Sequence, residues 1–135
     1  MIFIDTGAFL ARYVERDQHH ATAQLAWAEL GRSRQKAFTS NFVLDETLTL
    51  LARRVSYAFA SDRAAYIWAS DALTILRPTE PDELAALDLF RKYADQKVSF
   101  TDCISFALMK RQRLRRAFTF DRHFHAAGFE VWPAA

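Results

Sequence analysis

Four acidic residues could supply the oxygen ligands of a divalent metal ion, and they are Asp5, Glu46, Asp102 and Asp121. Mg²⁺ and Mn²⁺ prefer carboxylate and water oxygens, whereas zinc sites use several cysteines or histidines at helical i,i+4 spacing, which this sequence lacks. A bound ion of this kind lowers the pKa of a water molecule and neutralises charge developing on a phosphate. The residue types therefore favour metal-dependent hydrolysis of phosphodiester bonds, provided that the fold brings the four acids together.

Short apolar runs alternate with helical patterns along the chain. Strands are expected at residues 1–4, 37–39, 73–76, 117–120 and 130–132. Helices are expected at about residues 8–13, 18–30, 42–54, 56–70, from Pro81, and at 99–111. Alternating strands and helices indicate βαβ units, and short continuous apolar strands are typical of a parallel sheet buried on both faces. We therefore predict a three-layer α/β/α domain with a mainly parallel sheet.

This fold would gather the four acids at one edge of the sheet. Ligands of open parallel sheets bind outside the carboxyl ends of the strands. Asp5 and Asp121 directly follow expected strands. Glu46 lies near the start of the helix after the second strand, and Asp102 lies in the first turn of the helix before the fourth. Acids gathered there repel one another unless a cation lies between them, which favours a metal site.

Each acid also has a structural interpretation. Asp5 could cap the first helix, and Asp121 could cap the short turn that follows it. Glu46 could complement a helix dipole. The pattern from Ser99 to Asp102 matches a capping box. Taken singly, these interpretations are as good as the functional one, and the joint placement of the acids favours the site.

The composition sets bounds on the class of protein. A length of 135 residues, 51% of them hydrophobic, fits one domain over residues 1–135. The single cysteine, Cys103, excludes an intramolecular disulfide and suits a reducing cytoplasm. Asp5 and Arg12 interrupt the early apolar residues, so we expect neither a signal peptide nor a membrane span. The net charge of +2 neither indicates nor excludes RNA as a substrate.

Four segments together resemble the PIN domain, and most closely its VapC-like toxin branch. They are residues 2–8 (IFIDTGA), 41–46 (NFVLDE), 100–106 (FTDCISF) and 118–124 (FTFDRHF). The resemblance implies a parallel sheet of about five strands in the order 3-2-1-4-5 and an acidic Mg²⁺ (or Mn²⁺) site. It also implies endoribonuclease activity on structured RNA such as tRNA or rRNA, inhibition by a small antitoxin protein whose tail occupies the active-site groove, and a homodimer.

The resemblance also implies roles for the acids. Asp5 and Asp102 match the acids that bind the metal directly, and Glu46 and Asp121 match the acids that complete the site. Asp45 stands beside Glu46 in the same motif. Because adjacent helix residues point about 100° apart, only one of these two can face the site.

Other polar residues are assigned on the same basis or by their position. Thr6 and Thr119 match the small hydroxyl residues that position water or acids in the family. Arg122 and His123 follow Asp121 directly, where they could meet a phosphate.

Three rival functions share some of these features. A phospho-receiver module also clusters acids at a sheet edge, but it needs a lysine after a late strand, and here the fifth strand ends at Trp132. A phosphatase with an aspartate nucleophile usually has a second aspartate two residues later, and here that residue is Gly7. A PIN-like binding module without catalysis remains the alternative.

Several further groups of residues receive structural interpretations. Cys103 is expected to be a small buried hydrophobe. An aromatic stretch could form an interface or pack onto the sheet, and it contains Tyr57, Phe59, Tyr66 and Trp68. A basic run is expected opposite the acidic edge, where its side chains complement a helix dipole, and it contains Lys110, Arg111, Arg113, Arg115 and Arg116.

Overall fold

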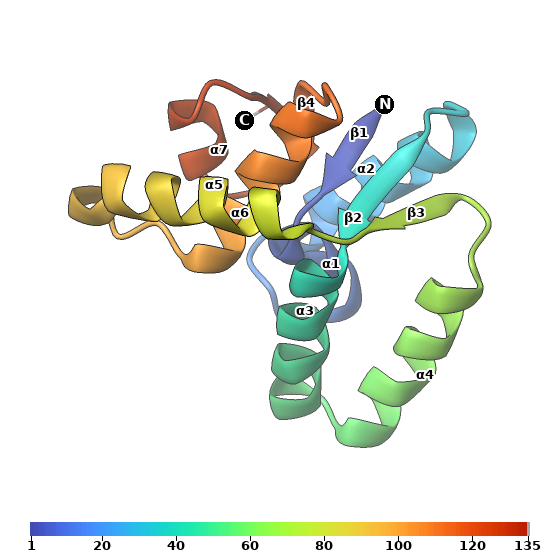
Figure 1. Cartoon of the computed structure of the whole chain (residues 1–135). Helices are drawn as coiled ribbons and strands as arrows, with labels where there is room; N and C mark the ends of the chain where they lie inside the picture. Colours follow the sequence, from blue (N-terminus) through green and yellow to red (C-terminus); the bar gives the residue numbers. More distant parts are fainter. Residues whose placement is uncertain (135) are drawn as a thin grey trace.

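The computed structural model describes residues 1–134 and contains a five-stranded sheet in the order β3-β2-β1-β4-β5 (Figure 1). All four strand pairings are parallel. The strands are β1 (Ile2–Ile4), β2 (Ala37–Ser40), β3 (Leu73–Leu76), β4 (Arg116–Phe118) and β5 (Glu130–Trp132). The predicted α/β class and strand order are therefore confirmed.

Helices follow the strands and cover the sheet. They are α1 (Thr6–Tyr13), α2 (His20–Arg32), α3 (Asn41–Arg54), α4 (Tyr57–Ala69), α5 (Glu80–Lys92), α6 (Phe100–Arg111) and α7 (His123–Ala126), with a 3₁₀ turn at Ala94–Gln96. The fourth strand ends two residues earlier than expected. The reason is local, because the hydroxyl of Thr119 accepts a hydrogen bond from the Asp121 N–H and turns the chain.

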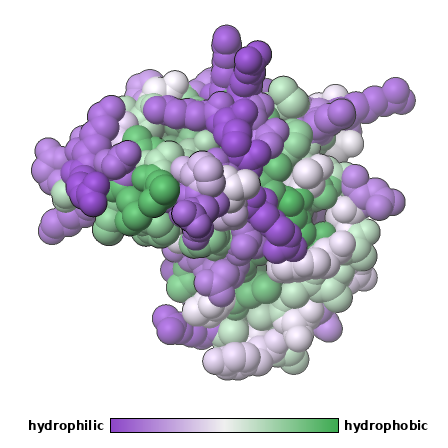
Figure 2. Space-filling view, in the orientation of Figure 1, coloured by the Kyte–Doolittle hydropathy of each residue, from purple (hydrophilic) through white to green (hydrophobic). Residues whose placement is uncertain are grey.

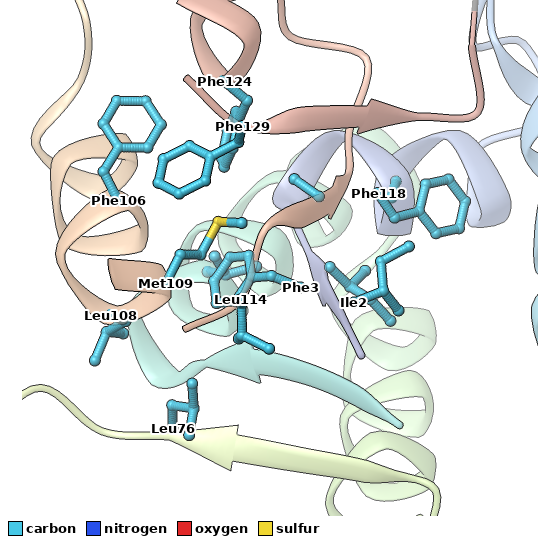
Figure 3. Close-up of a cluster of buried hydrophobic side chains, with 14 of the residues drawn as sticks. Ile2, Phe3, Leu76, Phe106, Leu108, Met109, Leu114, Phe118, Phe124 and Phe129 are labelled. Carbon is cyan, nitrogen blue, oxygen red and sulfur yellow. The ribbon is translucent and has the colours of Figure 1, made fainter. Parts of the chain in front are cut away.

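The central strand β1 fixes the position of the candidate site. Ile2, Phe3 and Ile4 are all buried, because β1 lies between β2 and β4 and is covered on both faces. Figure 3 shows Ile2 beside Phe118 on one side of the sheet, while Phe3 points to the other side. A strand held this firmly delivers the next residue, Asp5, to a defined place at the carboxyl edge.

The second half of the core orients α6 and α7. The ring of Phe106 in α6 makes an edge-on contact with Phe124 of α7, with centroids 5.0 Å apart, and a tilted contact with Phe129 at 5.6 Å. Figure 3 shows these three rings packed together, with Met109 of α6 nearby. Buried aromatic packing of this kind fixes the two helices whose first turns carry acids of the site.

An apolar strip on α5 is exposed at the surface. Leu84, Leu87 and Phe90 are each more than two-fifths exposed, and Figure 2 shows hydrophobic side chains over this helix, at the left of the view. Within residues 1–134, the helices are too short or too polar to cross a membrane.

Candidate active site

Asp5 is buried at the carboxyl end of β1, with 4% of its surface exposed. It occupies the N-cap position of α1, yet its side chain makes no capping hydrogen bond. Its Oδ2 instead accepts a 2.8 Å hydrogen bond from the hydroxyl of Thr119, just beyond β4. The helix-cap interpretation of Asp5 is therefore wrong for its side chain. That side chain instead links the residue that follows β1 to the residue that follows β4.

Asp102 lies in the first turn of α6 and is 7% exposed. Ser99 Oγ accepts a 3.1 Å hydrogen bond from the Asp102 N–H, which is one half of the expected capping box. The second half is missing here, whereas the box that begins α5 is complete, because the Thr79 N–H there donates a 2.9 Å hydrogen bond to Asp82 Oδ2. The carboxylate of Asp102 instead faces the other acids.

Glu46 and Asp121 are half-buried at the same edge. Asp121 Oδ1 accepts a 2.8 Å hydrogen bond from the His123 N–H and so does hold the short turn, as one interpretation expected. Asp45 is exposed, whereas the charge of Glu46 reaches both Asp5 and Asp102. The structure thus directs Glu46, and not Asp45, towards the site.

Burial and mutual repulsion raise the pKa values of the two innermost acids. Burial is the largest cause for Asp5, and the charges of Asp121 and Glu46 add to it, so that its pKa rises to about 7 despite the opposing hydrogen bond from Thr119. Burial is also the largest cause for Asp102, followed by the charge of Asp5, and its pKa rises to about 8. The raised pKa values show that the four clustered carboxylates lack a cation that would stabilise their ionised forms.

Cationic side chains do not supply that charge. Within residues 1–134, the ion pairs made by the four acids involve His123 and neither arginine nor lysine. Arg122 is exposed. Two members of the basic run are paired away from this edge, Arg111 with Asp82 at 2.9 Å and Arg116 with Glu130 at 3.3 Å. The donor set therefore fits a divalent cation that binds carboxylate oxygens.

Unpartnered polar atoms gather at the same edge. Thr6 Oγ1, Asn41 Oδ1 and His123 Nδ1 are buried without a hydrogen-bond partner. Asn41 begins α3 directly after β2, at the carboxyl end of that strand. Buried polar atoms without partners are costly, so this edge is prepared for a ligand or for water. Asn41 was not among the predicted site residues, although its position directly after a strand was an available signal.

Three of the four histidines are at least partly buried, although the lack of zinc-ligand spacing led us to expect solvated histidine side chains. The His123 side chain is 25% exposed, and its Nδ1 lies 3.1 Å from Asp121 Oδ1. Asp102, Asp121 and His123 each offer a ligand atom, and these atoms lie within 4.8 Å of one another. His19 stacks on Phe120 with ring centroids 4.4 Å apart. Only His125, which is exposed, fits the original interpretation.

The structure is thus a parallel sheet with an acidic cluster at its carboxyl edge. These features agree with one protein family. Residues 2–130 match the PIN domain family model, and the chain belongs to the PIN domain family. It is 37% identical over 134 residues to the 23S rRNA-specific endonuclease VapC20 of Mycobacterium tuberculosis, covering 98% of this chain and 99% of that protein. It is 31% identical over 137 residues to a VapC ribonuclease of Archaeoglobus fulgidus, covering 97% and 85%. The predicted VapC-like branch is confirmed.

Solved structures agree with this grouping. The crystal structure of M. tuberculosis VapC20, described as a Sarcin-Ricin loop cleaving toxin, matches with a TM-score of 0.87 and 34% identity over 96% of both chains. FitAcB from Neisseria gonorrhoeae matches with a TM-score of 0.68 and 22% identity over 97% of this chain and 96% of that one. The second likeness concerns the fold alone. The predicted PIN fold is confirmed, whereas the roles of the individual site residues remain predictions.

Proposed function

We propose that this protein is a divalent-metal-dependent endoribonuclease that uses Mg²⁺ or Mn²⁺ at the acidic edge. The observation that carries the proposal is the set of four carboxylates from distant segments, whose two buried members have raised pKa values. A metal ion bound there would lower the pKa of a water and neutralise charge on the scissile phosphate. Phosphodiester hydrolysis fits this chemistry, and the curated relatives are named as ribonucleases.

The side chains divide the work according to burial. Asp5 and Asp102 are fixed and buried, so we assign to them the direct contacts with the ion. Glu46 is half-buried and faces solvent, so its carboxylate can accept a hydrogen bond from the attacking water and take its proton as the water oxygen bonds to phosphorus. The bond from phosphorus to the leaving ribose oxygen breaks in the same step, and that oxygen takes up a proton from solvent. Asp121 is also half-buried, and its carboxylate lies close enough to Asp102 to complete the ligands of the ion. Thr119 holds Asp5 in place. The unpartnered hydroxyl of Thr6 can orient a water molecule.

Structured RNA is the proposed substrate class. A relative that spans nearly the whole chain is named for its action on 23S rRNA, and its solved structure is described as cleaving the Sarcin-Ricin loop. We therefore take that rRNA stem-loop as the first candidate, and tRNA as the second. Arg122 is exposed beside Asp121, where it can contact an RNA phosphate.

The direct test is cleavage of purified ribosomes, total RNA and a sarcin–ricin stem-loop oligonucleotide by the purified protein. Activity should require Mg²⁺ or Mn²⁺, disappear with EDTA, and disappear in Asp5→Asn. Glu46→Gln should lose activity, whereas Asp45→Asn, which changes an exposed neighbour in the same helix, should retain it. Absence of cleavage by folded, metal-loaded protein on all three RNAs would favour the alternative of a binding module without catalysis.

An antitoxin protein is the proposed partner, because the relative's structure is described as that of a toxin. A groove of about 1120 Å³ lies between α1, α2 and α4 on one face of the sheet. Phe9 and Trp27 line it with apolar surface, and Arg12 lies 4.4 Å from the Trp27 ring. Arg63 lies over Tyr66 at 4.6 Å. The groove is lined by residues that precede β2 and β3, among them Lys36 and Ala72, so it lies at the opposite end of the strands from the acids. We therefore propose that it holds an amphipathic, acidic segment of the antitoxin other than the tail that the family resemblance places in the active-site groove.

This pairing is tested by co-expression of this chain with candidate antitoxin proteins. A true antitoxin should co-purify and suppress RNA cleavage. Arg12→Glu and Arg63→Glu should weaken binding, whereas Arg113→Glu, outside the groove, should not. Binding that is insensitive to the groove substitutions would contradict this docking surface.

A homodimer is proposed from the aromatic surface of α4. Tyr57, Tyr66 and Trp68 are about half exposed or more, whereas Phe59 packs edge-on against Tyr13. Exposed aromatic rings are enriched at interfaces. Sedimentation analysis should show a dimer that Tyr57→Ser or Trp68→Ser weakens, and a monomer at all protein concentrations would contradict it.

A further inference from the structure

His123 places a ring nitrogen among the acids of the site. Its Nδ1 lies 3.1 Å from Asp121 Oδ1 and 3.9 Å from Asp102 Oδ2. These three ligand atoms come from two segments, the first turn of α6 and the turn that leads into α7. Three donors within 4.8 Å of one another can be shared by one ion.

The position of His123 is fixed from both sides. Its backbone N–H donates a 2.8 Å hydrogen bond to Asp121 Oδ1. The next residue, Phe124, is fully buried and packs against Phe106 of α6. The packing of α7 on α6 therefore holds the imidazole beside the acids, independently of any hydrogen bond made by the ring.

His123 Nδ1 lies within ion-pair distance of Asp121 and Asp102 but makes no hydrogen bond. Although Nδ1 lies close to Asp121 Oδ1, the contact lacks hydrogen-bond geometry, and the atom is buried. A buried nitrogen without a partner is costly unless a ligand completes it. Its neighbours are carboxylate oxygens, which present lone pairs of the same kind, so a cation shared with them satisfies all three groups.

We propose that His123 Nδ1 is a ligand of the same divalent ion that Asp102 and Asp121 hold, and that it tunes the site towards Mn²⁺ and other first-row transition metals over Mg²⁺. The inference rests on the proposed metal-dependent function. Imidazole nitrogen suits transition metals, whereas Mg²⁺ binds almost entirely through oxygen. Neither the acids alone nor the family match assigns this role.

The test compares Mn²⁺ and Mg²⁺ binding to metal-free protein by titration calorimetry. His123→Ala should weaken Mn²⁺ binding on the order of 10–100-fold, the range that changes around metal ligands produce. Its Mg²⁺ affinity should stay nearly unchanged. His125→Ala is the matched control, because His125 lies in the same short helix and is exposed. A thermal melt of each metal-free variant verifies that it is folded.

Pulsed electron paramagnetic resonance of the Mn²⁺-loaded protein gives a readout independent of activity. A ¹⁴N modulation from a coordinated imidazole should be present in the wild type and in His125→Ala, and absent in His123→Ala. Equal losses of Mg²⁺ and Mn²⁺ affinity, or Mn²⁺ bound without a ¹⁴N signal, would overturn ligation by His123 and leave the proposed function standing. A wild type that binds neither ion, with or without RNA, would overturn both.

Discussion

The hydroxyl of Thr119 donates a 2.8 Å hydrogen bond to Oδ2 of Asp5, although the two residues are 114 positions apart. The hydroxyl oxygen of Thr119 in turn accepts a 3.0 Å hydrogen bond from the Asp121 N–H. Thr119 is fully buried. One hydroxyl therefore fixes the carboxylate that follows β1 and the backbone of the acid that follows β4, and it sets their relative positions.

Substitutions of Thr119 can distinguish the contribution of its side-chain volume from that of its hydrogen bonds. Thr119→Val keeps the volume but leaves the Asp121 N–H and Asp5 Oδ2 without their partner. We expect a loss of about 1–3 kcal/mol in the free energy of unfolding, measured by urea denaturation, and a larger relative loss of RNA cleavage. Thr119→Ser keeps the hydroxyl and should restore most activity. Equal activity in Val and Ser variants would contradict the positioning role.

The stability of the metal-free protein should fall as the pH rises from about 4 to about 8. The pKa values of Asp5 and Asp102 are raised to about 7 and about 8, so between the unfolded and folded values the folded chain binds more protons. The free energy of unfolding then decreases with pH across that window. Urea denaturation in EDTA at several pH values measures the slope. Asp5→Asn should flatten it, and an unchanged slope would show that Asp5 does not titrate as described.

Divalent metal should reverse this loss. An ion that binds only the folded chain stabilises it by about 2.7 kcal/mol at a free concentration one hundred times its Kd. For a chain of this size that is several degrees in Tm. Scanning calorimetry with and without Mn²⁺ at pH 8 is the measurement, and Asp102→Asn should remove most of the shift. An equal shift in that variant would place the stabilising ion elsewhere.

Asp82 should protect the fold against acid. Burial alone would raise its pKa, but hydrogen bonds from Thr79 and from the Arg111 guanidinium lower it below the usual range. A lowered pKa gives stability that is present above the unfolded value near 4 and lost as the pH falls through the folded value. Asp82→Ala should cost about 2 kcal/mol at pH 7, and less at pH 3. An equal cost at both values, in urea denaturation, would contradict a role of the charge.

Cys103 should be inert in the folded protein. It is fully buried, and burial followed by the neighbouring charge of Asp102 raises its pKa to about 11. The thiolate is the reactive form, so a disulfide reagent such as DTNB should react only as fast as the chain unfolds. Rapid reaction under native conditions would show that α6 opens locally next to the site.

Much of this architecture was readable from the order of residue types. Alternating apolar strands and helices identified a parallel sheet, and the rule that such sheets bind ligands at their carboxyl edge selected Asp5 and Asp121, which directly follow strands. Four weak motifs in sequence order indicated the family, and with it the strand order that no local pattern could give. These inferences succeeded because they rest on chain order and local periodicity.

Only the tertiary structure decided how residues in similar local sequence patterns differ in their contacts. Thr79–Asp82 and Ser99–Asp102 offer the same local capping pattern, but only Asp82 accepts the second hydrogen bond of the capping box, and Asp82 also pairs with Arg111. Asp102 meets other acids instead. The position of His123 likewise depends on its neighbour Phe124, which packs against Phe106 of α6. A side chain's partner across the fold determines its charge state and exposure, and that partner is set by packing between distant segments, which local sequence does not record.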